Sequence, residues 1–135
     1  MISRLRALNH RIGYRGSVLL FLALWCGGNA SRLAWPPPEA RGTSTLVYLS
    51  TIAPLPVLAV PWALVAILCL VQAFMRADWL AFTALAGLLM IWAVVYLVGG
   101  ARGVIPQATW AVIIQIVVAG LVVKISRWPE PHREP

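Results

Sequence analysis

The feature that most limits the fold of this chain is a succession of long apolar runs separated by short connectors. A membrane-spanning helix needs about 20 apolar residues to cross a hydrocarbon core about 30 Å thick. With 61% hydrophobic and 11% charged residues, the chain has too little polar surface to cover itself in water. The sequence therefore predicts an all-α, polytopic membrane protein of about four transmembrane helices, with spans near residues 17–35, 56–75, 79–98 and 108–125.

The second apolar stretch, residues 46–75, is too long for one straight span, and three prolines interrupt its first half. Proline lacks a backbone N–H and is tolerated in the first turn of a helix, where that donor has no partner. We therefore expect a short interfacial helix over residues 46–52, with Tyr48 at the level of the lipid headgroups. The second span follows, with Pro56 and Pro61 in its first turns.

The connectors between the later spans are short. Arg76 and Asp78 lie in a very short polar turn, so the second and third spans are expected to be antiparallel neighbours. Residues 99–106 form the next connector, in which Gly99 and Gly103 are expected to serve turn formation.

The chain divides into three parts by composition. Residues 1–16 form a basic juxtamembrane segment, in which apolar side chains recur at helical spacing, at Ile2, Leu5, Leu8 and Ile12. Such a segment suits the membrane surface, where anionic lipid attracts each cation by about 1 kcal/mol. Residues 17–126 form the four-helix membrane domain. Residues 127–135 form a charged, proline-rich tail that we expect to be disordered.

Orientation is predicted from the Lys and Arg residues in the short connectors, because these are enriched on the cytoplasmic side. One side would hold eight cations, namely Arg4, Arg6, Arg11, Arg15, Arg76, Lys124, Arg127 and Arg133. The other side would hold three, namely Arg32, Arg41 and Arg102. The asymmetry predicts that both termini are cytoplasmic.

A cleaved signal peptide is the alternative reading of the first apolar run. The basic start, the short apolar run and the sequence Gly28-Asn29-Ala30 fit a small-residue cleavage site. Cleavage would leave three spans and an N-terminus outside the cytoplasm, and the sequence leaves this alternative open.

Small residues recur every four positions on two of the spans, at Ala23, Gly27 and Ser31 and at Ala59 and Ala63. Such spacing lets helix backbones approach closely in lipid. Self-association of the protein would use such stripes, but ordinary packing between helices of one chain is the favoured interpretation, because Ala and Gly are common in membrane spans.

Polar side chains within the spans are expected to face the bundle interior, where they can form hydrogen bonds between helices. Gln115 lies near the middle of the fourth span, Thr83 and Tyr96 lie in the third, and Asn29 lies late in the first. Polar groups lining a pore would have the same pattern. No ionisable residue lies at mid-span, which disfavours a transporter that needs a charged relay.

The sequence predicts no catalytic, cofactor-binding or metal site. The acidic residues and histidines lie in connectors or terminal segments, at Glu39, Asp78, Glu130, Glu134, His10 and His132. Cys26 and Cys69 lie inside apolar runs without metal-ligand neighbours. The net charge of +7 is distributed between apolar blocks, which is typical of membrane topology and argues against nucleic acid as a partner.

Two runs carry a resemblance to a known group of proteins. They are residues 3–16, with the sequence SRLRALNHRIGYRG, and residues 68–76, with the sequence LCLVQAFMR. Together with the triple-proline connector and the tryptophan-rich spans, they make the chain similar to small membrane proteins of actinobacterial phages. The resemblance implies a phage or prophage origin and a place in the host cytoplasmic membrane, and it implies no activity or binding residues.

Three functions remain open at this stage. The first is a non-enzymatic phage-type membrane protein that acts by helix–helix association, holin-like in lysis, with the lipid bilayer and further copies as partners. The second is an accessory or superinfection-immunity protein that binds a partner membrane protein. The third is a small transporter or channel subunit.

Overall fold

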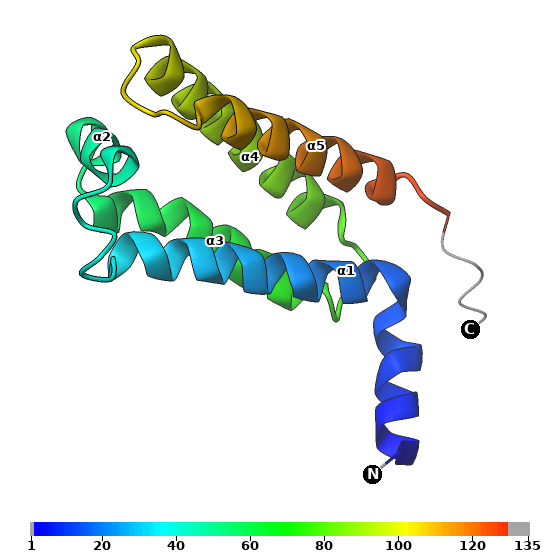
Figure 1. Cartoon of the computed structure of the whole chain (residues 1–135). Coiled ribbons are helices and arrows are strands. Elements are labelled where there is room, and N and C mark those ends of the chain that lie inside the picture. Colours follow the sequence, from blue (N-terminus) through cyan, green and yellow to red (C-terminus); the bar gives the residue numbers. More distant parts are fainter. Residues whose placement is uncertain (1, 130–135) are drawn as a thin grey trace.

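A computed structural model describes the backbone of residues 2–129 and the side chains of residues 13–129. The described part is all-helical, which confirms the all-α part of the prediction (Figure 1). Its helices are α1 (Ile2–Ala34), α2 (Ser44–Ile52), α3 (Leu55–Gln72), α4 (Trp79–Ala101) and α5 (Ala108–Ser126).

Within the described residues, four helical segments are long and apolar enough to cross a membrane: Gly13–Ala34, Leu55–Gln72, Trp79–Ala101 and Ala108–Ser126. They lie close to the four predicted spans. α3 ends three residues early, because the side chain of Gln72 turns to the start of α4. α4 continues three residues further than predicted, because Gly99 and Gly100 are helical and pack against the following connector.

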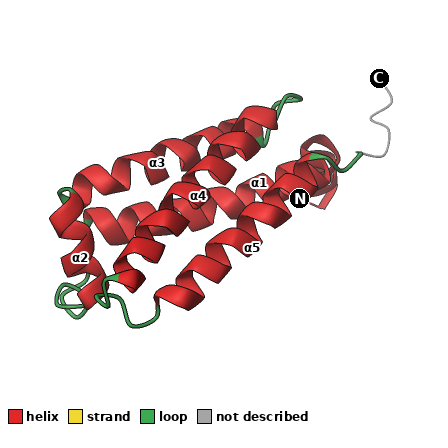
Figure 2. Cartoon of the chain, turned by 90° about the horizontal axis from the view of Figure 1, so that it is seen from above, coloured by secondary structure: helices red, strands yellow, loops and turns green. Residues whose placement is uncertain are grey.

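The spans form two antiparallel hairpins. α1 packs along α3, and α4 packs along α5, whereas α3 and α4 share a much smaller contact (Figures 1 and 2). The expectation that the second and third spans are close neighbours is therefore only partly met, since α3 pairs chiefly with α1. The molecule consists of an α1–α3 hairpin and an α4–α5 hairpin joined by residues 73–78.

A bend at Gly13 divides α1 into two segments. The backbone of Gly13 has φ 63° and ψ 177°, a conformation that is essentially restricted to glycine. The Ser17 hydroxyl donates a hydrogen bond to the Gly13 carbonyl oxygen at 3.1 Å, at the start of the span. The preceding helical segment, residues 2–12, turns sharply away from the hairpins (Figure 1).

The short helix α2 lies in the long connection between α1 and α3, as predicted for residues 46–52. It follows Pro36, Pro37 and Pro38, after α1 has ended at Ala34. Pro56 lies in the first turn of α3 and Pro61 one turn further, and the helix continues through both. α2 lies across one end of the two hairpins, at the end opposite the chain termini (Figure 1).

The buried residues form one continuous cluster that reaches from α1 to α5. Its largest fully buried side chains are Phe82, Leu19, Leu49, Leu85, Leu89, Val122, Cys26 and Cys69. Each span nevertheless directs many apolar side chains outward, such as Leu24, Leu64, Ile91 and Val117. Outward apolar faces on every span are what a lipid environment requires.

Candidate functional site

A row of aromatic side chains connects the two hairpins through their middle. The ring centroids of Trp25 in α1 and Trp62 in α3 are 5.7 Å apart at 85°, an edge-to-face arrangement. Trp62 is also 5.7 Å from Trp92 in α4, which is 5.9 Å from Tyr96. Trp62, which is only 2% exposed, therefore lies where three helices meet. Aromatic pairs of this kind contribute about 0.5–1.5 kcal/mol each beyond the area they bury.

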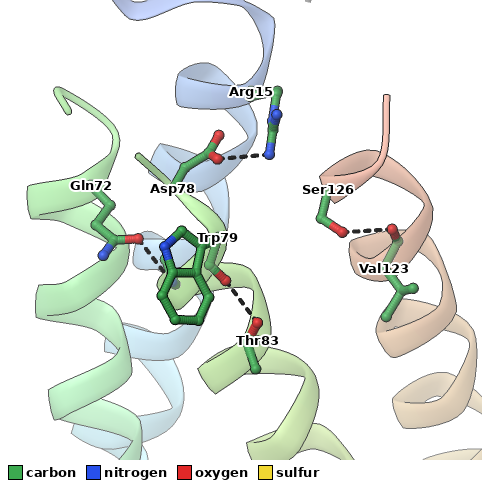
Figure 3. Close-up of polar contacts among 8 residues, drawn as sticks. Arg15, Gln72, Asp78, Trp79, Thr83, Val123 and Ser126 are labelled. Carbon is green, nitrogen blue, oxygen red and sulfur yellow. Dashed lines mark hydrogen bonds and ion pairs between the residues drawn. The ribbon is translucent and has the colours of Figure 1, made fainter. Parts of the chain in front are cut away.

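An ion pair joins the hairpins at the end where the chain termini lie. Nη2 of Arg15 in α1 donates a hydrogen bond to Oδ1 of Asp78 at 2.6 Å, and the two side chains are only 21% and 14% exposed. The guanidinium also lies over the ring of Phe82 in α4, 5.5 Å from its centroid. Figure 3 shows Arg15 and Asp78 reaching toward one another, the first from α1 and the second from the residue directly before α4. Within the described side chains, this is the only ion pair.

Gln72 forms a second polar contact at this end. Its Oε1 atom accepts a hydrogen bond from the backbone N–H of Ala81 at 2.8 Å (Figure 3). The first N–H groups of a helix have no partner within the helix. Because Asp78 makes no side-chain cap on α4, Gln72 supplies one of the missing acceptors from the end of α3.

The opposite end of the hairpins is held together by α2. The hydroxyl of Tyr48 donates a hydrogen bond to the carbonyl oxygen of Val95 in α4 at 3.3 Å. Tyr48 is buried, so it is packed against protein and not displayed to lipid headgroups as the sequence had led us to expect. A Cβ atom on Gly99 would lie 2.9 Å from Cε1 of Tyr48 and 2.6 Å from Cδ1 of Ile105.

α4 and α5 approach one another closely at Gly100. A Cβ atom there would lie 2.5 Å from the Cβ of Ala108, closer than real Cβ contacts come. Sequence reasoning missed this contact because it assigned the 99–106 glycines to a turn. Only Gly103, with φ 68°, has the turn conformation that was predicted.

The predicted small-residue stripes lie in different surroundings. Ala59 is buried in α3 and Ala63 is half-buried. On α1, Ala23 and Gly27 are half-buried and Ser31 is exposed. A Cβ atom on Gly27 would meet nothing within 4 Å, so no other described helix approaches the backbone there.

The polar residues of the spans also lie in different surroundings, some buried and some exposed. Gln115 is 8% exposed and faces the interior as predicted, and its Oε1 atom has no hydrogen-bond partner among the described residues. Asn29 is half-buried and donates through Nδ2 to the Trp25 carbonyl oxygen at 2.9 Å. The prediction for Thr83 is wrong. It is exposed, because its hydroxyl donates to the Trp79 carbonyl of its own helix at 2.8 Å and needs no partner inside.

The cations gather at the two ends of the hairpins as the sequence grouped them. Arg15 lies at the start of the first span, Arg76 lies between α3 and α4, and Lys124 and Arg127 lie at the end of α5, so all four belong to the same end of the hairpins. Arg32, Arg41 and Arg102 belong to the end with α2. The side chains of Arg4, Arg6 and Arg11 lie outside the described residues, as does most of the 127–135 tail.

Exposed aromatic side chains mark the same two ends. Tyr14, Trp79 and Trp128 are exposed at the end with the termini, and Trp35 and Trp110 at the other. At 1.5 Å per residue, Tyr14 and Trp35 are separated by about 31 Å along α1, close to the thickness of a hydrocarbon core. Tryptophan and tyrosine are enriched at both membrane–water interfaces.

An open cleft of about 340 Å³ lies between α4 and α5 beside their connector. Its lining is apolar apart from the Thr109 hydroxyl and the backbone, and includes Leu97, Ile105, Pro106 and Val112. Among the described residues, no three His, Cys, Asp or Glu side chains come together as a metal site. The described part of the arrangement offers chiefly contacts between helices.

Four apolar helices with aromatic side chains at both ends indicate a multi-pass membrane protein. No protein family, curated protein or solved structure matches the chain. The resemblance to phage membrane proteins thus stays a prediction.

Proposed function

We propose that this chain is a non-enzymatic integral membrane protein of phage type that acts by helix–helix association in the host cytoplasmic membrane, as holins do. The observation that carries the proposal is the outward apolar surface of all four spans. Side chains such as Leu24, Leu64, Ile91 and Val117 are exposed on a single chain. In lipid, such faces are free to pack against the spans of further copies.

Assembly of several copies is required for a passage through the membrane. Among the described side chains, the only buried polar ones are Gln72 and Gln115. Gln72 already binds the Ala81 N–H, so a single chain offers one free buried amide and no polar lining. A water-filled path therefore needs surfaces from more than one chain.

The test is expression of the chain alone in a host cell while the membrane potential is followed with a dye. We expect the potential to collapse at a defined time. Gly100→Leu is the control, because it disrupts the α4–α5 contact in a chain that still carries all its apolar runs. Normal growth at high expression, with the protein shown to be in the membrane, would contradict the proposal.

A superinfection-immunity or accessory protein that binds a partner membrane protein is the second candidate. The Arg15–Asp78 ion pair favours it, because it neutralises the only two charged side chains that are not exposed among the described residues. This candidate predicts co-purification with one specific membrane protein, no leakage, and resistance of the expressing host to a related phage. Unchanged plating of every phage tested would rule it out. No observation favours a small transporter or channel subunit.

We further propose that both termini are cytoplasmic. The support is the gathering of Arg15, Arg76, Lys124 and Arg127 at one end of the hairpins. A reporter that is active only outside the cytoplasm should be inactive when fused after Pro135 and active when inserted near Ala40. An active C-terminal fusion would contradict this orientation and direct attention to cleavage after Ala30.

A further inference from the structure

The α1–α3 hairpin and the α4–α5 hairpin touch one another in few places. Each hairpin has an extensive contact between its own helices, whereas α3 and α4 share a small one. The described side-chain hydrogen bonds that join the α1–α3 side of the molecule to the α4–α5 side are Arg15 with Asp78, Gln72 with Ala81 and Tyr48 with Val95. The first two lie beside residues 73–78, and the third lies at the opposite end of the molecule. The hairpins are thus two well-packed units that meet over a smaller contact, which includes the packing of Trp62 against Trp92.

The Arg15–Asp78 contact differs from the Tyr48–Val95 hydrogen bond in strength and in position. It joins two charges at 2.6 Å in a partly enclosed place, and the guanidinium also covers the Phe82 ring. The acceptor Asp78 directly precedes α4 and the Phe82 ring lies in its first turn, so Arg15 contacts the start of the α4–α5 hairpin from α1, across 63 residues of sequence. Figure 3 shows that Arg15 makes this contact from the first turn of the span.

Arg15 also lies two residues after the bend at Gly13. A change in the direction of residues 2–12 therefore moves the backbone that carries the guanidinium. The bend depends on a backbone conformation that only glycine adopts without strain.

We propose that the Arg15–Asp78 ion pair is a latch that holds the two hairpins closed, and that the bend at Gly13 couples this latch to the orientation of residues 2–12. Breaking the pair lets the start of α4 move away from α1 about residues 73–77, while each hairpin stays intact. The inference goes beyond the proposed function, because it concerns the closed and open states of one chain whatever that chain does in the membrane.

The experiment measures two distances by pulsed electron paramagnetic resonance on the full chain in lipid nanodiscs. Nitroxide labels at the exposed positions Phe21 and Val117 report on the separation between hairpins, and labels at Phe21 and Leu64 report on the α1–α3 hairpin itself. The buried Cys26 and Cys69 are replaced by alanine in every variant, so that only the introduced cysteines are labelled.

Asp78→Asn and Arg15→Gln should each shift the Phe21–Val117 distances to longer values, by up to about 10 Å, the diameter of one helix. The Phe21–Leu64 distances should stay unchanged. The double variant should shift no further than either single one, because both changes remove the same contact. Gly13→Ala should produce a shift in the same direction.

Arg76→Gln is the matched control, since it removes an exposed cation two residues from Asp78 that has no described ion pair. It should leave both distances unchanged. The charge-exchanged variant, Arg15→Asp with Asp78→Arg, should restore the closed distances.

An unchanged Phe21–Val117 distance in Asp78→Asn would overturn the latch. So would a simultaneous broadening of both distances, because the effect of the substitution would then not be confined to the contact between the hairpins. An unchanged distance in Gly13→Ala would overturn the coupling to residues 2–12. None of these readouts depends on lysis or on a partner, so failure of the proposed function would leave them intact.

Discussion

The α1–α3 hairpin and the α4–α5 hairpin pair their helices by opposite means. In the first, a large side chain fills the contact, since Trp62 packs edge-to-face against Trp25 and also reaches Trp92. In the second, the absence of a side chain permits the contact, since Gly100 lies directly against Ala108. The first is expected to be sensitive to loss of volume and the second to gain of volume.

The connections between the helices agree with this difference. Residues 35–54, which include α2, separate α1 from α3, whereas only residues 102–107 separate α4 from α5. A short connection holds the ends of α4 and α5 close together. Such a close approach requires small residues at that point. A long connection imposes no such limit, so bulky aromatic rings can determine how the helices pair.

Among these variants, Trp62→Ala is expected to cause the largest loss of folding stability. Replacing a buried tryptophan by alanine leaves a cavity and costs about 3–5 kcal/mol of folding stability. It should loosen α1, α3 and α4 together, because Trp62 contacts rings on both other helices. Titration with a denaturing detergent, followed by circular dichroism, measures the loss. Leu64→Ala, an exposed change on the same helix, should cost much less, and an equal cost for both would refute the assigned role of Trp62.

Gly100→Ala tests the other hairpin by adding one methyl group. That group would lie 2.5 Å from the Ala108 Cβ, so the helices must move apart, at a cost of about 1–3 kcal/mol. The same detergent titration measures it. Gly87→Ala is the control on the same helix, because a Cβ at Gly87 meets nothing within 4 Å. If both alanines are tolerated alike, the close approach at Gly100 is not a determinant of the hairpin.

Each hairpin contains one buried glutamine, Gln72 in α3 and Gln115 in α5, and substituting each one tests the comparison further. Gln72→Leu removes the acceptor of the Ala81 N–H and should cost about 1–3 kcal/mol. Gln115→Leu should be neutral or stabilising in a single chain, because the Gln115 Oε1 atom has no partner among the described residues. The same titration, carried out in a large excess of detergent so that chains are isolated from one another, compares the two variants. A large loss in Gln115→Leu under those conditions would indicate a hydrogen bond that this structure does not contain.

Thr83→Ala should have the smallest effect, within about 0.5 kcal/mol. Its hydroxyl bonds only to the Trp79 carbonyl of its own helix, and its side chain is exposed. A loss above 1 kcal/mol in the same titration would mean that Thr83 contacts another chain in the membrane.

The location of the spans was predictable because bilayer thickness imposes a fixed run of apolar residues. Which spans pair was not predictable, because apolar runs of similar hydropathy carry no information on their partners. Arg15 and Asp78 meet across 63 residues, and neither residue has a local signal for this contact. Gln115 was placed correctly because a polar side chain in lipid prefers the interior, and Thr83 was misplaced because threonine can satisfy its hydroxyl within its own helix.

The pairing of α1 with α3 has a consequence for the synthesis of the protein. α1 has the lowest mean hydropathy of the four candidate spans, and its partner follows only after residues 35–54. At about 5–20 residues per second, the ribosome needs about 2–8 s to extend the chain from Ala34 to Gln72. During that interval the nascent α1 has no helix to pack against, so its insertion depends on the translocon and on lipid alone. The α4–α5 hairpin, by contrast, emerges as consecutive apolar segments that can leave the translocon as a pair.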